Sequence, residues 1–154
     1  MNNINKIIEY IIPETLRLNN IYLPDESLKI NYSAIFCQND KEYDELNFEA
    51  SLIGNAVEDT PTGPLYKLNE SIKTPVGPLW LLKIRKPYIT HLQRGDADYT
   101  LNDYQVFKEK YLQDQEHFKL IDRGNFEMIE LKDPKFNVLC YFSNIPLTLQ
   151  LGIE

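Results

Sequence analysis

Cysteine is scarce in this sequence. The chain has 154 residues and only two cysteines, Cys37 and Cys140, each within an apolar segment that resembles a strand. A disulfide between them would require the two segments to be adjacent strands. We expect both thiols to be reduced and buried, as is usual for free cysteines in cytoplasmic proteins. The sequence therefore predicts a cytoplasmic protein whose length supports a core without disulfide bonds.

Long apolar runs are also missing. The isoleucine-rich N-terminal segment is interrupted by Lys6 and Glu9, and no small-residue cleavage site follows it. It therefore lacks the pattern of a signal peptide. No other segment approaches the roughly 20 consecutive apolar residues that a membrane helix needs. We expect no membrane partner.

Basic residues are outnumbered by acidic ones. There are 16 Lys and Arg against 23 Asp and Glu, which gives a formal net charge of −7. This balance argues against nucleic-acid binding, because a nucleic-acid-binding face must be basic to displace counterions. With 43% hydrophobic and 25% charged residues, the composition is that of a folded protein rather than a disordered one. We expect a single domain over residues 1–154.

Motifs that identify an enzyme class are absent. The chain has no glycine-rich phosphate loop, no nucleophile elbow and no cysteine pair with zinc spacing. The sequence therefore predicts neither a cofactor nor a bound metal. His91 and Asp96 are the weak candidates for acid–base catalysis, with Asp98 close by. The alternative is that these two carboxylates only stabilise the start of the helix that follows them.

Hydrophobic periodicity predicts helices at both ends of a group of strands. Isoleucines at helical spacing indicate an amphipathic helix over residues 3–12, which Pro13 should end or kink. This helix either docks on a sheet or serves as a dimer interface. Alternation of apolar and polar residues predicts strands, and an acidic segment between the first two resembles a hairpin loop. The strands are expected at 28–36, 46–52, 64–68, 78–85, 117–121, 126–131 and 137–142, with a second helix at 101–112 that Thr100 and Asp103 cap.

The clustering of strands indicates an α+β fold. We expect a curved, largely antiparallel sheet of about six or seven strands, one N-terminal amphipathic helix and one central helix. Two similar segments, TPTGPLYKL and TPVGPLWLL, predict that two of the strands are entered through the same kind of turn. Gly63 and Gly77 should supply the backbone angles that such turns require.

Residues 71–95 contain no acidic residue and five basic ones, Lys73, Lys83, Arg85, Lys86 and Arg94. A positive segment on an acidic protein can attract and orient small anions. Arginine side chains bind carboxylates and phosphates through paired hydrogen bonds. The predicted ligand-binding residues are Lys83, Arg85 and Arg94, with Tyr88 and Tyr99 as walls of the pocket. The alternative is that these basic residues only balance acidic residues elsewhere in the chain.

The function predicted first is a non-catalytic cytoplasmic binding module with an anion-accepting patch around residues 83–94. Its partner would be a protein or a small anionic ligand, and it could form a homodimer. The first alternative is a small metal-independent enzyme that acts on a carboxylate- or phosphate-bearing molecule. The second alternative is a small inhibitor protein of a phage or mobile element.

Overall fold

The protein is described from a computed structural model that covers residues 3–152. This part of the chain forms four helices and eight strands. In chain order they are α1 (Asn3–Tyr22), β1 (Lys29–Phe36), α2 (Asp40–Ile53), β2 (Gly54–Thr60), β3 (Gly63–Thr74), β4 (Gly77–Arg85), β5 (Gly95–Thr100), α3 (Tyr104–Tyr111), β6 (Phe118–Asp122), β7 (Glu127–Leu131), β8 (Val138–Ser143) and α4 (Leu147–Gln150).

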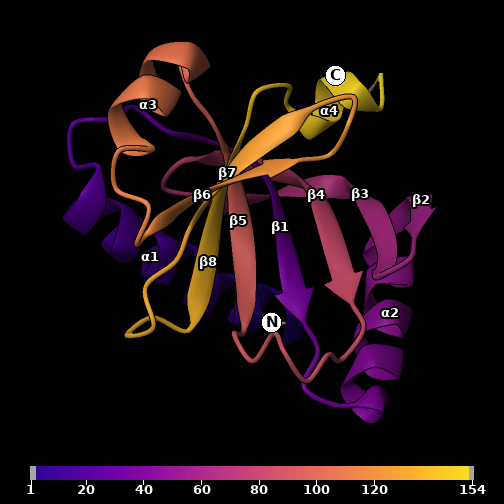
Figure 1. Cartoon of the computed structure of the whole chain (residues 1–154). Coiled ribbons are helices and arrows are strands. Elements are labelled where there is room, and N and C mark those ends of the chain that lie inside the picture. The colour runs from indigo at the N-terminus through magenta and orange to yellow at the C-terminus, as the bar shows by residue number, and fades with distance from the viewer. Residues whose placement is uncertain (1–2, 153–154) are drawn as a thin grey trace.

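All eight strands belong to one mixed sheet with the order β2-β3-β4-β1-β5-β8-β7-β6. β1 is parallel to β4 and β5 is parallel to β8, whereas the other neighbours are antiparallel. The order strand, helix and three strands occurs twice, and each copy forms one half of the sheet (Figure 1). The α+β class is confirmed. The expectation of a largely antiparallel sheet with six or seven strands and two helices was wrong in detail.

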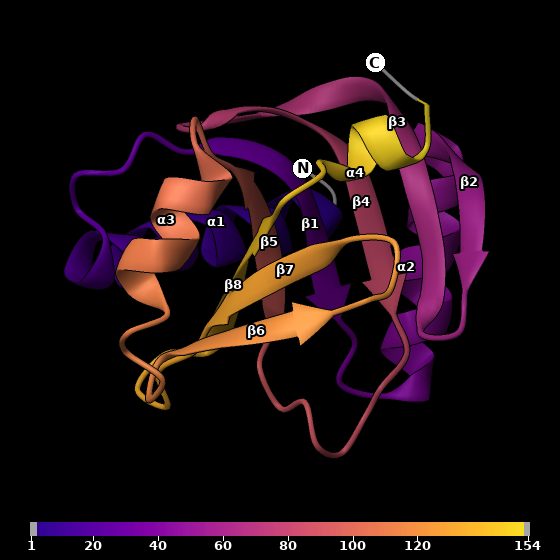
Figure 2. The same ribbon diagram turned by 45° about the horizontal axis from the view of Figure 1, so that its top comes forward.

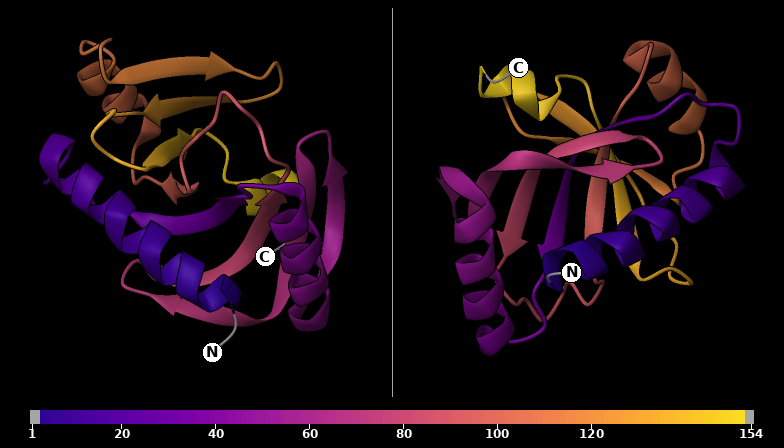
Figure 3. Two further views of the ribbon diagram at one scale, coloured as in Figure 1. Left: turned by 90° about the horizontal axis from the view of Figure 1, so that it is seen from below. Right: turned by 180° about the vertical axis from the view of Figure 1, so that it is seen from behind.

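The N-terminal helix covers one face of the sheet. Ile4, Ile8, Ile11 and Ile12 of α1 are at most 1% exposed, and the helix packs mainly on β5 and β8. Figure 3 shows α1 and α2 against this face, so docking of the isoleucine stripe on the sheet is confirmed. Pro13 does not end α1, which continues to Tyr22. The second half of the helix also buries apolar side chains, and this burial offsets the backbone hydrogen bond that proline cannot donate.

The segment predicted as a strand over 46–52 is instead part of helix α2. Asn39 begins this helix because its side-chain oxygen accepts a hydrogen bond from the Glu42 backbone N–H (2.8 Å). Leu46 and Ala50, one helical turn apart, are buried against the sheet. The acidic segment before them, predicted as a hairpin loop, forms the first turns of the helix. Apolar residues at every second position had suggested a strand.

The two similar turns are confirmed. The Thr60 hydroxyl donates to the Gly63 carbonyl (2.7 Å), and the Thr74 hydroxyl donates to the Gly77 carbonyl (2.6 Å). Both glycines have positive φ angles, 140° at Gly63 and 108° at Gly77, which other residues rarely adopt. These turns connect β2 to β3 and β3 to β4, so β3 is a long strand shared by two hairpins.

Strand β5 was not predicted. Residues 95–100, expected to be a loop and a helix cap, form a buried strand at the centre of the sheet. Thr100 is the last residue of this strand, and Asp103 alone caps α3 by accepting a hydrogen bond from the Val106 N–H (3.1 Å). Both cysteines are free and buried, as expected. No helix within residues 3–152 is long and apolar enough to cross a membrane.

We call the face of the sheet opposite α1 and α2 the inner face. Figure 2 shows that the sheet curls, so that β6 and β7 come forward over this face, and that α4 lies on the same side. Side chains alternate between the two faces along each strand. In β4, for example, Leu82 and Ile84 belong to the core cluster under the helices, and Lys83 lies on the inner face.

Candidate functional site

A row of residues in register crosses the centre of the inner face. Lys83 on β4 pairs with Ala34 on β1, and Ala34 pairs with Asp96 on β5. Lys83 and Asp96 are thus two strands apart, about 10 Å between their backbones. Only the methyl group of Ala34 lies between them on this face. The small side chain leaves room for a cavity where a larger residue would fill the space.

The cavity has a volume of about 120 Å³. Its floor comes from the four central strands, and its rim comes from the β2–β3 and β6–β7 turns. It is therefore built at the junction of the two halves of the sheet. The lining residues are Tyr32, Ala34, Thr62, Lys83, Arg85, Asp96, Arg123, Met128 and Tyr141.

Asp96 is the buried acid of the cavity. It is 4% exposed, and its Oδ1 accepts a hydrogen bond from the Ala34 backbone N–H (3.2 Å). Burial raises the pKa of Asp96 from 3.8 to about 7, although the positive charges of Arg85 and Lys83 oppose this rise. Near neutral pH, Asp96 can therefore both accept and donate a proton.

Lys83 and Arg85 place positive charge in the same cavity. Burial lowers the pKa of Lys83, and the charge of Asp96 counteracts this effect. The Arg85 guanidinium carbon lies 4.7 Å from the centroid of the Phe36 ring. Within residues 3–152, neither basic side chain forms a close ion pair with a carboxylate. Their hydrogen-bond donors are therefore available to an anion in the cavity.

Asp98 lies on the inner face next to the cavity. It is 1% exposed, and its Oδ2 accepts a hydrogen bond from the Ser143 hydroxyl (2.7 Å). Burial raises the pKa of Asp98 to about 8, and the nearby charge of Asp96 adds to this effect. The two carboxyl groups therefore disfavour one another's ionised forms, which helps to keep a proton in this region at neutral pH.

The structure brings together only some of the predicted ligand-binding residues. Lys83 and Arg85 line the cavity, and Tyr88 lines an adjoining groove that Arg85 shares. Arg94 lies elsewhere, because its guanidinium donates two hydrogen bonds to the Glu42 carboxylate (2.7 and 2.9 Å). This ion pair is the intramolecular charge balance that we had considered as the alternative.

The two remaining candidates, Tyr99 and His91, do not line the cavity. Tyr99 lies on the opposite face of the sheet, under α1, where its hydroxyl forms a hydrogen bond with that of Thr15 (2.7 Å). His91 lies outside the cavity, stacked on the Tyr88 ring with 5.3 Å between the ring centroids. Burial and the nearby Arg85 lower the pKa of His91. Of the two predicted acid–base residues, only Asp96 therefore lies in the cavity.

Several residues that line the cavity were not predicted from the sequence as site residues. Tyr32 shares the face of Ala34 in the predicted first strand, so its position followed from the alternation of that strand. Tyr141 lies in the predicted last strand, where its hydroxyl donates to Glu130 (2.8 Å). Thr62 and Arg123 lie in turns, and no local pattern indicated that these turns approach the same cavity.

The cavity is a poor metal site. Asp96 is the carboxyl group in its lining, and the positive charges of Lys83 and Arg85 would repel a cation. In the described part of the chain, only one cluster of potential metal-binding side chains occurs, in the α3–β6 connection, and none of its residues lines the cavity. It consists of Asp114, Glu116 and His117, and its His117 Nδ1 is already paired with Asp114 (2.8 Å).

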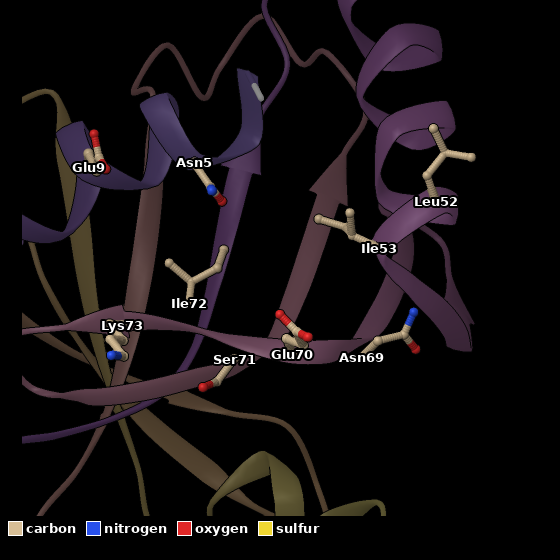
Figure 4. A pocket seen from close by; sticks show the side chains of 9 residues that line it. All are labelled: Asn5, Glu9, Leu52, Ile53, Asn69, Glu70, Ser71, Ile72 and Lys73. Carbon is tan, nitrogen blue, oxygen red and sulfur yellow. The ribbon is translucent and has the colours of Figure 1, made fainter. Parts of the chain in front are cut away.

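A larger hollow lies on the helical side of the protein. It has a volume of about 570 Å³ and lies between α1, the end of α2 and β3 (Figure 4). Its charged side chains, Glu9, Glu70 and Lys73, are all exposed. Water therefore solvates all three of these side chains. The inner-face cavity is the better candidate for a functional site, because it combines a buried acid, Asp96, with the half-buried Lys83 and Arg85.

Comparison with known proteins identifies the fold. No family model matches the sequence, and no curated protein matches it either. A structural-genomics protein named Protein EC4020 superposes with a TM-score of 0.73 at 11% identity, over 94% of this chain and 87% of that one. A glyoxalase/bleomycin resistance protein/dioxygenase superfamily member from Vibrio splendidus 12B01 gives 0.49 at 11% identity, over 75% of this chain and 97% of that one. An extradiol ring-cleaving dioxygenase from B. fuscum gives 0.46 at 10% identity, over 82% of this chain and 36% of that one. At these identities the likeness is one of fold alone.

The prediction of a non-catalytic binding module with an open basic patch is corrected. The patch itself does not form, because Glu42 holds Arg94 away while Lys83 and Arg85 line a cavity with a buried acid. The physical reason is the alternation of β4, which directs Lys83 and Arg85 to the inner face.

Proposed function

We propose that the inner-face cavity is the active site of an enzyme that binds a small anionic molecule and transfers a proton within it. The observation that carries this proposal is the position of Asp96. Its carboxyl group is 4% exposed and lines a small cavity together with Lys83 and Arg85. A buried acid facing basic side chains in a cavity is typical of catalytic sites.

Arg85 and Lys83 have the binding role. A carboxylate or phosphate on the substrate would accept hydrogen bonds from the Arg85 guanidinium, which suits such groups geometrically. Arg123 on the β6–β7 turn adds a third positive charge at the rim. Because the cavity walls exclude much of the water, these interactions are stronger than on an open surface. The protein as a whole has a formal net charge of −7, so an anion is attracted to this positive site rather than to the rest of the surface.

Asp96 has the proton-transfer role. As a carboxylate it takes a proton from an acidic C–H or O–H group of the substrate and becomes the neutral acid. The electron pair of the broken bond stays on the substrate as an oxyanion, which the positive charges of Lys83 and Arg85 stabilise. Return of the proton to another atom completes an isomerisation and restores the carboxylate. The pKa of Asp96 near 7 suits both directions of transfer.

Anion binding tests the first step. Inorganic phosphate, oxalate and acetate are titrated by calorimetry, and the thermal midpoint is recorded with each, since a ligand of the native state raises it. Arg85→Ala should abolish the shift. Ala34→Leu should also abolish it, because it fills the cavity while all charges remain. The matched control is Arg17→Ala on α1, where the guanidinium pairs with Glu14 away from the cavity. Binding that persists in Arg85→Ala and Ala34→Leu would contradict the site.

Proton transfer is tested by deuterium uptake in D₂O. Small 2-oxo acids and phosphorylated ketones with acidic C–H groups are incubated with the protein, and loss of the C–H signal is followed by proton NMR. We expect Asp96→Asn to slow the exchange by about 10²–10⁴-fold while anion binding remains. Since the base is the carboxylate, the rate should rise with pH through about 7. Equal exchange rates in the wild type and Asp96→Asn would refute the role of Asp96.

A further inference from the structure

A second hollow adjoins the cavity and shares two of its residues. It has a volume of about 410 Å³ and lies between the β2–β3 turn and the segment that follows β4. Thr62 and Arg85 belong to both hollows, so an anion held by Arg85 would lie where the two meet. We call this second hollow the proline groove, and its lining residues are Pro61, Thr62, Arg85, Lys86, Pro87 and Tyr88.

The aromatic wall of the proline groove is held in place. Tyr88 is 57% exposed, yet its ring stacks on His91 with 5.3 Å between centroids and an interplanar angle of 29°. His91 in turn contacts the Phe36 ring edge-on at 6.1 Å, and Phe36 lies under the Arg85 guanidinium. The chain of contacts leads from Tyr88 back to the anion-binding arginine. A ring placed in the groove would therefore meet an ordered aromatic surface next to Arg85.

The lining of the groove favours a flat group over a flexible alkyl chain. Pro61 and Pro87 are rigid and have no backbone N–H to donate, so they offer apolar surface that loses little entropy on binding. Thr62 and Lys86 add polar groups to this lining. Cavity and groove together fall within the roughly 300–1,000 Å³ of small-molecule sites, whereas the cavity alone is smaller.

We infer that the proline groove is a binding subsite for the planar aromatic or heteroaromatic part of the substrate. The anionic group attached to that ring is held by Arg85, and the reacting part extends toward Asp96. This inference rests on the proposed function, because Arg85 must first hold the anion. The substrate class is therefore small aromatic or heteroaromatic acids and phosphate esters.

Binding of matched ligands tests this subsite. Benzoate and cyclohexanecarboxylate carry the same charge on rings of similar size, but only benzoate is flat. We expect calorimetry to show benzoate bound about 3- to 10-fold more tightly, which is the range of aromatic stacking. Phenyl phosphate should bind more tightly than inorganic phosphate, by at least the same factor. The ratios should fall to about one in Tyr88→Ala and survive in Tyr88→Phe.

The controls separate this inference from the proposed function. Tyr10→Ala removes another exposed tyrosine, on α1, and should leave both ratios unchanged. If acetate and phosphate bind through Arg85 but the ring adds no affinity, the subsite is refuted and the anion site stands. If the ring preference persists in Tyr88→Ala, the ring binds elsewhere and the subsite is also refuted. If no anion binds to the wild type, both proposals fail.

Discussion

The two halves of the sheet share one topology but bring different side chains to the cavity. The first half supplies Lys83 and Arg85 from β4, and the second half supplies Asp96 from β5 and Arg123 from the β6–β7 turn. The halves meet at the antiparallel pairing of β1 with β5, where Ala34 lies opposite Asp96. Only the second half supplies an acid to the cavity lining, and only the first half supplies basic side chains from a strand. The proposed site is therefore a property of the junction between two similar units.

The helices of the two halves differ as well. Each half has one helix between its first and second strands, α2 in the first and α3 in the second. On α2, Phe48 is 68% exposed and Leu52 is 66% exposed. On α3, Phe107 is 1% exposed and contacts the rings of Phe118 and Phe142. The second half therefore uses its helix to complete an aromatic core, whereas α2 leaves Phe48 and Leu52 exposed among charged residues such as Asp44 and Glu45.

Truncating one phenylalanine in each helix should give the largest contrast. Phe107→Ala leaves a cavity among packed rings, so we expect a loss of about 3–5 kcal/mol in the free energy of unfolding. Phe48→Ala removes an exposed side chain and should change it by less than about 0.5 kcal/mol. Urea unfolding followed by circular dichroism measures both. A large loss in Phe48→Ala that depends on protein concentration would show that α2 is covered in a dimer.

Asp96, at the junction of the two halves, should make the free energy of unfolding fall as the pH rises. Because the pKa of Asp96 rises from 3.8 to about 7 on folding, the native state binds a proton more tightly than the unfolded chain. Its contribution to stability is full below pH 3.8 and is lost as the pH rises to about 7. Each pKa unit corresponds to about 1.4 kcal/mol, so the loss that Asp96 itself contributes across this window should be a few kcal/mol.

Substituting Asp96 and Asp98 in turn shows which carboxyl group causes this pH dependence. Asp96→Asn should flatten the stability curve between about pH 4 and 7, and Asp98→Asn should flatten it up to about pH 8. Urea unfolding at a series of pH values provides the curves. The same slope in the wild type and in Asp96→Asn would mean that this carboxyl group titrates normally in the folded protein.

Local sequence patterns predicted the first half of the site. Alternation along one strand was enough to place Lys83 and Arg85 on the same face. The repeated Thr-Pro-x-Gly-Pro pattern was enough to predict the turns at Gly63 and Gly77. Each of these inferences needs only a few neighbouring residues. A protein partner, a homodimer and a cytoplasmic location stay predictions.

The rest depended on pairing between distant segments. Ala34 and Asp96 are 62 residues apart, and no local pattern indicates that their strands are neighbours. Arg94 was assigned to the pocket because it lies in the basic segment 71–95, and its pairing with Glu42 of α2 joins positions 52 residues apart. The duplicated topology of the two halves appeared only in the structure.

Corresponding turns of the two halves should differ in how much stability the protein loses when their glycine is replaced by alanine. Gly63 lies in the β2–β3 turn and Gly124 in the β6–β7 turn, and both have positive φ angles, 140° and 91°. An added Cβ at Gly63 would lie 2.0 Å from the Ile84 carbonyl oxygen, whereas nothing lies within 4 Å at Gly124. Gly124→Ala should therefore lose only the roughly 1–2 kcal/mol of a left-handed backbone. Gly63→Ala should lose about 1–2 kcal/mol more, because strand β4 must also shift. Urea unfolding of both variants measures the difference, and equal losses would show that the β2–β3 turn can move away from β4 without penalty.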